Sequence, residues 1–181
     1  YYLGIDIGAS SVKVAVVDAN GAVLRVLRRA HKGSPLPCLG ALLGELADAG
    51  DLPGECGRAD VTGCGADMLR AAAPAVLELE EVPALVKGVR ALAPQAASVI
   101  GMGAQSGVFA TGFAHGSAAE FAKNESCAAG TGSFYEDQMQ RLGSPLESYS
   151  DLVARAQSVP RLSGRCSVFA KTDIIHRQQE G

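Results

Sequence analysis

Residues 4–13, with the sequence GIDIGASSVK, contain the polar groups that a phosphate-binding turn needs. The turn consists of small residues, so backbone N–H groups can approach phosphate oxygens closely. Two serines could add hydroxyl donors, and a lysine could add positive charge. The residues that we predict to bind a nucleotide phosphate are Gly8, Ala9, Ser10, Ser11 and Lys13. The alternative is a polar hairpin turn that binds no ligand.

Asp6 carries a charge within the apolar strand that precedes this turn. A carboxylate in such surroundings costs free energy unless it meets a metal ion, a hydrated metal ion or a hydrogen-bond donor. Mg²⁺ is a fitting partner because it prefers oxygen ligands and keeps several waters. Asp6 is therefore a candidate catalytic residue, although the same pattern also fits an edge acid of an ordinary hairpin.

A second small-residue turn follows 95 residues later, from Gly8 to Gly103. When LGIDIGASSVKVAVV is laid over VIGMGAQSGVFATG, the acid Asp6 falls on Gly101. Two interpretations stay open: a coincidence between two glycine-rich hairpins, or a duplicated lobe whose two phosphate-binding hairpins face each other. The candidate residues of the second turn are Gly103, Ala104 and Gln105, the last to orient a water molecule.

The five cysteines stand at positions 38, 56, 64, 127 and 166. Their number is odd and they include no CxxC pair, so a disulfide framework or a zinc ribbon is disfavoured. Thiols of this kind are mostly small buried apolar groups. Cys127 lies a few residues before an expected helix, whose positive N-terminal end would favour a negatively charged ligand.

Hydrophobic periodicity and turn residues predict an α/β chain. The expected strands span 1–7, 12–17, 22–29, 59–62, 97–102 and 107–113. The first three would form an antiparallel meander, with a tight turn at 18–21 where Asn-Gly tolerates positive φ. The expected helices span 38–49, 84–92, about 132–142, 148–158 and 167–179, with a loop at 161–166.

The chain has 181 residues, of which 48% are hydrophobic, and its net charge is −3. That length suits one domain or two small lobes, and the apolar share excludes a disordered chain. No basic footprint is present, so we expect no nucleic-acid partner. No apolar stretch approaches the roughly 18 residues of a membrane helix, and the start does not read as a signal peptide. We therefore expect a cytoplasmic protein without a membrane partner.

On these motifs the chain resembles the ATPase activators of 2-hydroxyacyl-CoA dehydratases and the related ATP-driving subunits of benzoyl-CoA reductases. The matching segments are 4–13, 61–69, 81–88, 103–105, NESCAAGTGSFYE at 124–136 and CSVFAKTDII at 166–175. The resemblance implies the actin-like, ribonuclease H-like ATPase fold, with two duplicated lobes of mixed sheet and flanking helices. We place the first lobe at 1–94 and the second, which is partial, at 95–181.

The resemblance also implies cofactors and partners. Cys127 and Cys166 would bind a 4Fe-4S cluster, which needs four thiolates and therefore two chains of a homodimer. Gly130, Thr131 and Gly132 would bring backbone donors near a phosphate or the cluster. ATP or ADP with Mg²⁺ would bind in the cleft, with Asp6, Gln105 and Glu81 as the catalytic residues, although Glu81 fits an ordinary surface acid equally well. An electron would then pass from a ferredoxin or flavodoxin to the dehydratase component.

The sequence departs from the family pattern at the second turn. Gly101 takes the place of an acid and Val108 that of a lysine, so hydrolysis is expected to be slow or absent. Leu85 replaces a common histidine, and Cys64 a tyrosine. The chain has no starting Met and ends before the adenosine-binding motif, so we expect a piece of a longer protein. The alternatives are a benzoyl-CoA reductase ATPase subunit, a degenerate nucleotide-binding or scaffold domain, and a small-molecule kinase.

Overall fold

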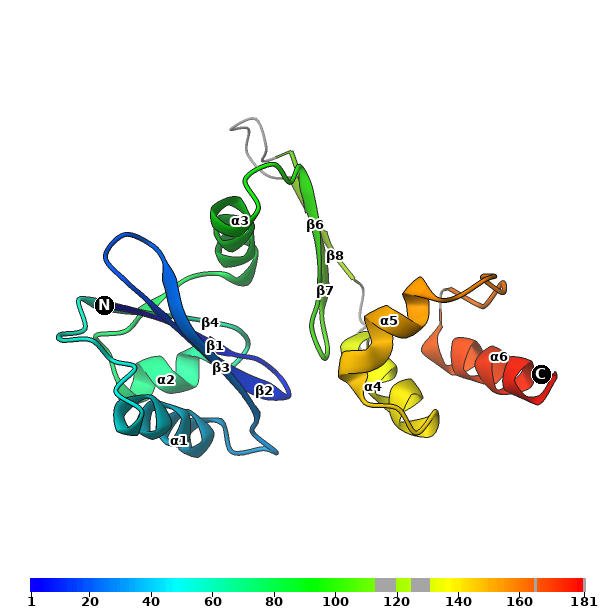
Figure 1. The fold of residues 1–181 in the computed structure, drawn as a ribbon, viewed down its shortest axis with the longest axis horizontal. Helices are drawn as coiled ribbons and strands as arrows, with labels where there is room; N and C mark the ends of the chain where they lie inside the picture. Colours follow the sequence, from blue (N-terminus) through cyan, green and yellow to red (C-terminus); the bar gives the residue numbers. More distant parts are fainter. Residues whose placement is uncertain (113–119, 125–130, 165, 181) are drawn as a thin grey trace. The chain divides into compact units, whose positions relative to one another are not determined.

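The computed structural model describes residues 1–112, 120–124, 131–164 and 166–180. The chain divides into two compact units, Tyr1–Gln95 and Ala96–Gly181, and each is described by itself (Figure 1).

The first unit is built on a five-stranded mixed sheet with the strand order β3-β2-β1-β4-β5. The antiparallel pairs β1–β2 and β2–β3 form the expected meander, whereas β1–β4 and β4–β5 are parallel. The predicted meander is therefore confirmed. The strands are β1 Tyr2–Ile7, β2 Ser11–Val17, β3 Val23–Ala30, β4 Arg58–Thr62 and β5 Leu77–Glu78.

The turn between β2 and β3 is held by a side chain. The Asp18 carboxylate accepts the N–H groups of Asn20 and Ala22, each at 2.8 Å. These hydrogen bonds, that from Ala22 above all, lower the pKa of the Asp18 carboxyl. Gly21 has a φ of 88°, a backbone conformation that glycine adopts without strain.

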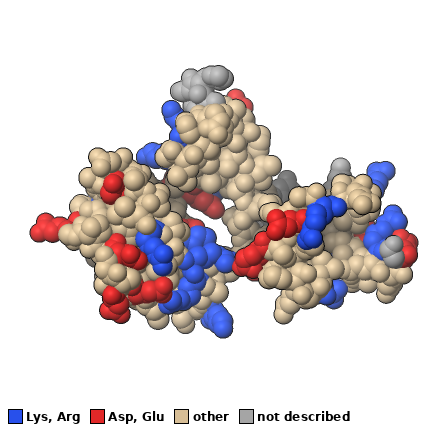
Figure 2. Space-filling model, in the orientation of Figure 1, with Lys and Arg blue, Asp and Glu red and all other residues tan. Residues whose placement is uncertain are grey.

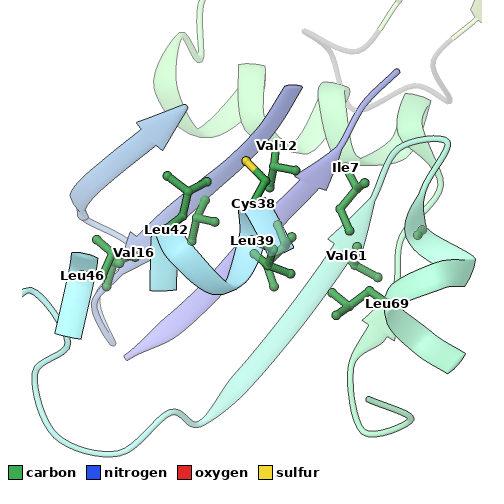
Figure 3. Close-up of a cluster of buried hydrophobic side chains, with 12 residues drawn as sticks. Ile7, Val12, Val16, Cys38, Leu39, Leu42, Leu46, Val61 and Leu69 are labelled. Atoms are coloured by element: carbon green, nitrogen blue, oxygen red, sulfur yellow. The ribbon is translucent and has the colours of Figure 1, made fainter. Parts of the chain in front are cut away.

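Helix α1 (Pro35–Asp48) covers one face of this sheet and supplies much of the core (Figure 3). The helix begins with proline in its first turn, where the missing N–H costs nothing. Its apolar residues recur at helical spacing, and they pack against the alternate strand residues that point toward the helix. The fully buried members of the core are Ile7, Val12, Val14, Val16, Leu42, Leu46 and Val61.

Two short elements complete the first unit and have no counterpart in the sequence prediction. These are helix α2 (Ala66–Ala72), which follows β4, and the two-residue strand β5. Helix α3 (Glu81–Leu92) is where it was expected, although it begins three residues earlier.

The second unit begins with a three-stranded antiparallel sheet, β6-β7-β8. Its strands are β6 Ser98–Met102, β7 Gly107–Thr111 and β8 Glu120–Lys123, the last not predicted. Helical elements follow: α4 Thr131–Arg141, η2 Leu146–Ser148, α5 Tyr149–Ala154 and α6 Ser167–Glu180. Helix α5 is therefore shorter than the predicted helix at 148–158.

Polar and aromatic contacts connect the helices of the second unit. Lys171 of α6 donates to the Asp137 carboxylate of α4 at 2.8 Å, and this hydrogen bond is the main cause of a lowered pKa of Asp137. The rings of Tyr135 and Tyr149 meet edge to face at 5.1 Å, and burial is the first cause of a raised pKa of Tyr149.

Acidic and basic side chains are intermixed on the face of the molecule shown in Figure 2. Ion pairs of the first unit include Arg29–Glu45 at 2.6 Å and Arg25–Asp51 at 3.3 Å. No helix in the described ranges is long and apolar enough to cross a lipid bilayer.

Candidate functional site

The turn between β1 and β2 is closed by one backbone hydrogen bond and leaves other donors open. The Gly8 N–H donates to the Ser11 carbonyl oxygen at 3.0 Å. Within the described residues, the N–H groups of Ala9 and Ser10 have no protein acceptor. Small side chains and open N–H groups are the properties that allow a turn to hold an anion.

Asp6 and Lys13 form an ion pair at the base of this turn. The two residues are direct cross-strand partners, and Lys13 Nζ lies 2.6 Å from Asp6 Oδ2. The Asp6 carboxylate thus meets a donor, which is one of the environments that the sequence required for it. A Cβ atom at Gly8 would lie 3.8 Å from both Asp6 Oδ1 and Lys13 Nζ, so both charges stand beside the turn.

The loop between β4 and α2 lies against the same turn, and its glycines explain part of the matching segment 61–69, which begins VTGCG. Gly65 N–H donates to the Ile7 carbonyl oxygen at 2.9 Å. Gly63 has a φ of 92°, and a Cβ there would lie 2.5 Å from the Ile7 oxygen and 2.6 Å from Asp6 Oδ1. The exposed Cys64 contacts the same carbonyl oxygen at 3.7 Å.

A pocket of about 240 Å³ lies beside the ion pair, on the sheet face opposite α1. It forms over small side chains, because Gly4 and Ala15 are cross-strand neighbours there. Ala84 of α3 and Thr62 of β4 also line the pocket. The Thr62 hydroxyl oxygen is buried and has no hydrogen-bond partner among the described residues.

The turn between β6 and β7 repeats the geometry of the first turn. Gly103 N–H donates to the Ser106 carbonyl oxygen at 2.7 Å, as Gly8 does to Ser11. Gly101 and Val108 are cross-strand partners in the second hairpin. They occupy the positions that Asp6 and Lys13 occupy in the first hairpin. The second hairpin therefore has the turn without the ion pair. Val108 is only 3% exposed, whereas the Lys13 side chain is 43% exposed.

Helix α4 begins directly on the second turn. Gly132 N–H donates to the Gly103 carbonyl oxygen at 2.9 Å, and Ser133 N–H donates to that of Ala104 at 3.2 Å. A Cβ on Gly132 would overlap the Gly103 carbonyl, so only glycine allows this approach. The first residue of α4 is Thr131.

Cys166 stands at the N-terminal end of α6. Its carbonyl oxygen accepts the Ala170 N–H at 2.9 Å, and the residue is half-buried with a free thiol. The preceding loop is tied to the same helix, since Ser163 donates its hydroxyl and N–H to Asp173 at 2.7 and 2.9 Å. These two bonds lower the pKa of the Asp173 carboxyl.

Not all predicted site residues can be placed. Cys127 and Gly130 lie outside the described residues. Gln105 is exposed on the second turn, and Glu81 is an exposed first residue of α3. In the described part of the chain, no three His, Cys, Asp or Glu side chains are grouped as metal ligands. The structure therefore assembles two turns, one within each unit, and places Cys166 at a helix terminus.

Comparison with known proteins gives matches along the chain. The model of the BadF/BadG/BcrA/BcrD ATPase family matches residues 3–181. The activator of lactoyl-CoA dehydratase from Anaerotignum propionicum is 28% identical over 182 residues, which cover 100% of this chain and 69% of that protein. The (R)-2-hydroxyglutaryl-CoA dehydratase activating ATPase of Acidaminococcus fermentans is 26% identical, and the match covers 100% of this chain and 68% of that protein.

Two solved structures share the fold. The activator of 2-hydroxyisocaproyl-CoA dehydratase from Clostridium difficile, with bound ADPNP, superposes with a TM-score of 0.79 at 22% identity and covers 99% of this chain and 66% of its own. Component A of the Acidaminococcus fermentans (R)-2-hydroxyglutaryl-CoA dehydratase superposes with a TM-score of 0.82 at 24% identity. The match covers 99% of this chain and 68% of that one. The expected fold class, an actin-like α/β ATPase fold, is confirmed.

Proposed function

Because the chain belongs to the BadF/BadG/BcrA/BcrD ATPase family, we propose that it is an ATP-dependent activator that delivers single electrons to a 2-hydroxyacyl-CoA dehydratase. The observation that carries this proposal is the similarity, over the whole chain, to relatives that are named as activators of such dehydratases. The geometry of the two turns and the position of Cys166 support it.

The phosphate-binding residues of this proposal belong to the two turns. Open N–H groups of the first turn and the charge of Lys13 receive phosphate oxygens of MgATP. Phosphate competes with Asp6 for Lys13. The released Asp6 carboxylate can then bind the magnesium ion or its water ligands. Gly103 and Ala104 are the proposed phosphate-binding residues of the second turn, and Gln105 is the residue proposed to orient the attacking water. Glu81 is a further acid that we assign to catalysis.

The residues at α6 suit an iron–sulfur cluster. Cys166 has a free, half-buried thiol at a helix N-terminus, where the helix dipole favours negative charge. Thiolates are the usual ligands of such clusters, and Cys166 with Cys127 of two chains would supply the four that a 4Fe-4S cluster needs. When bound, the cluster would supply one-electron chemistry at low potential. Cys38, Cys56 and Cys64 all lie in the first unit and take no part.

The contact between α4 and the second turn supports a coupling of nucleotide binding to electron transfer. Gly132 and Ser133 donate to the carbonyls of residues 103 and 104, so a turn that moves on phosphate binding displaces the start of α4. The segment that carries Cys127 leads directly into that helix. Nucleotide-driven movement of loops is an established type of switch. The electron donor is a ferredoxin or flavodoxin, and the acceptor is the dehydratase component.

One observation favours a second candidate function, a nucleotide-binding domain with little hydrolysis. The pair Gly101–Val108 offers neither the carboxylate nor the amine of the first hairpin. Calorimetry that detects ATP binding, together with a phosphate-release assay that detects no turnover, would favour this candidate over an active ATPase.

The test of the main proposal is anaerobic purification with iron and sulfide analysis. We expect a brown, oxygen-sensitive protein, and we expect Cys127→Ser and Cys166→Ser to remove its visible absorption and its iron. Cys56→Ser is the matched control, because this exposed thiol lies in the first unit. A colourless wild-type protein without iron would refute the proposal. A heterodimer in the iron-loaded state would favour the benzoyl-CoA reductase type.

A further inference from the structure

His31, which follows β3, contacts the first turn at two points. Its backbone N–H donates to the Ser10 carbonyl oxygen at 3.1 Å. Its ring atom Nε2 lies 3.1 Å from the Gly8 carbonyl oxygen. The GIDIGASSVK motif that defines the turn does not include this residue, which is 23 positions away from Gly8.

The partners of the two ring nitrogens determine the tautomer of His31. Nδ1 accepts the Gly33 N–H at 3.1 Å, so this nitrogen carries no proton. The Gly8 carbonyl can only accept, so Nε2 carries the proton and donates it. Lys32 and Gly33 have φ values of 48° and 88°, and these left-handed conformations turn the Gly33 N–H back to the ring. A neutral imidazole thus connects residues 31–33 to the turn.

The two carbonyls held by His31 belong to peptide groups that also carry N–H donors of the turn. In a planar trans peptide, C=O and the following N–H point in opposite directions. Holding the Gly8 carbonyl therefore fixes the direction of the Ala9 N–H. The backbone bond to the Ser10 carbonyl anchors the other side of the turn to the residue that follows β3. The Gly8 N–H is already engaged by the Ser11 oxygen, so the turn is constrained on both sides.

We propose that His31 is a positioning residue for nucleotide phosphate, because its ring holds the Gly8 carbonyl and thereby orients the open N–H donor of Ala9. This inference rests on the proposed binding of a nucleoside di- or triphosphate at this turn. Donors that are oriented before the ligand arrives lose less freedom on binding, so the affinity for the phosphate groups is higher.

Two substitutions separate the functions of the ring nitrogens. His31→Gln places an amide N–H where Nε2 stands, so donation to Gly8 is kept. His31→Asn keeps an acceptor near the position of Nδ1 for Gly33, but its side chain is too short to reach Gly8. The backbone bond to Ser10 is present in both variants. They differ therefore in the bond to the Gly8 carbonyl.

The experiment measures the dissociation constants of ADP and of ATP with Mg²⁺ by calorimetry on the full chain, with adenosine as the ligand without phosphate. We expect His31→Asn to weaken both nucleotides roughly 3- to 10-fold, the effect of one net hydrogen bond. His31→Gln should stay within about twofold of wild type. Adenosine affinity should be the same in all three proteins, and their thermal unfolding midpoints should agree.

Two results would overturn the inference while the proposed function stands: wild-type affinity in His31→Asn, or an equal loss in both variants. A wild-type chain that binds ADP and ATP no better than adenosine, or does not bind them at all, would overturn the inference together with the nucleotide part of the proposed function. The wild-type titration therefore distinguishes the two failures.

Discussion

Gly63 leaves no room for a side chain beneath the first turn. Its φ of 92° is unfavourable for any residue with a Cβ, and the nearest atoms belong to the Ile7 carbonyl and the Asp6 carboxylate. The absence of a side chain at Gly63 thus lets the β4–α2 loop lie close to both the Ile7 carbonyl and the Asp6 carboxylate, the candidate partner of a magnesium ion.

Gly63→Ala should lower the free energy of unfolding by about 2 kcal/mol or more, because a left-handed conformation alone costs roughly 1–2 kcal/mol and the Cβ overlap adds to it. Chemical denaturation of the full chain measures this. Gly40→Ala is the matched control: Gly40 lies in α1, and a methyl group there would meet no neighbouring side chain within 4 Å, so we expect a gain of roughly 0.5–1 kcal/mol. Equal effects at the two sites would contradict the close-approach argument.

Residue-scale features differ in how far the sequence predicts them. Asp6 and Lys13 were expected at one site, and antiparallel pairing brings them together because equal numbers of residues separate each from the turn. His31 could not be found in this way. Its contact depends on the left-handed backbone at Lys32 and Gly33, and no periodic pattern indicates such a conformation.

At the scale of elements, the ion pair between Lys171 and Asp137 connects α6 to α4. The hydrogen bond from Lys171 lowers the pKa of Asp137, so the folded state favours the ionised carboxylate. A lowered pKa contributes stability above the ordinary value of 3.8, and this contribution is lost as the pH falls below that value. Both side chains are partly exposed, so solvent screens the effect and it is small.

We expect Asp137→Asn to lower the thermal unfolding midpoint slightly at neutral pH, with the difference from wild type vanishing as the pH falls below 3.8. Lys171→Met should give the same pH profile, because it removes the same hydrogen bond from the other side. The thermal unfolding midpoint of the double variant should be no lower than that of either single variant. A difference that stays constant across the pH range would contradict the assignment.

Element prediction succeeded where an apolar pattern was long. Helix α1 repeats its buried residues over 14 positions, and β2 has valine at four of its seven positions. The elements without a prediction are α2, β5, β8 and η2, with seven, two, four and three residues. Segments of this length complete at most two helical turns or one strand repeat, so their boundaries depend on tertiary contacts.

At the scale of the whole molecule, each chain would supply only two of the four thiolates that the proposed cluster needs. We therefore expect the iron-loaded protein to be a homodimer, and removal of the iron or Cys166→Ser to shift it toward monomers. Anaerobic sedimentation with parallel iron analysis measures this, and Cys56→Ser should behave as wild type. A monomer that retains a full complement of iron would contradict the shared cluster.

Strand β3 has a consequence for the behaviour of the chain at high concentration. It stands at the edge of its sheet and pairs only with β2 among the described strands, while its Val23, Leu24 and Val26 are exposed. An open edge with apolar side chains invites pairing with another molecule and, from there, fibrous aggregation. The arginines of β3 oppose this, because an added strand would have to desolvate them. The charges along this edge thus act as a barrier against self-association.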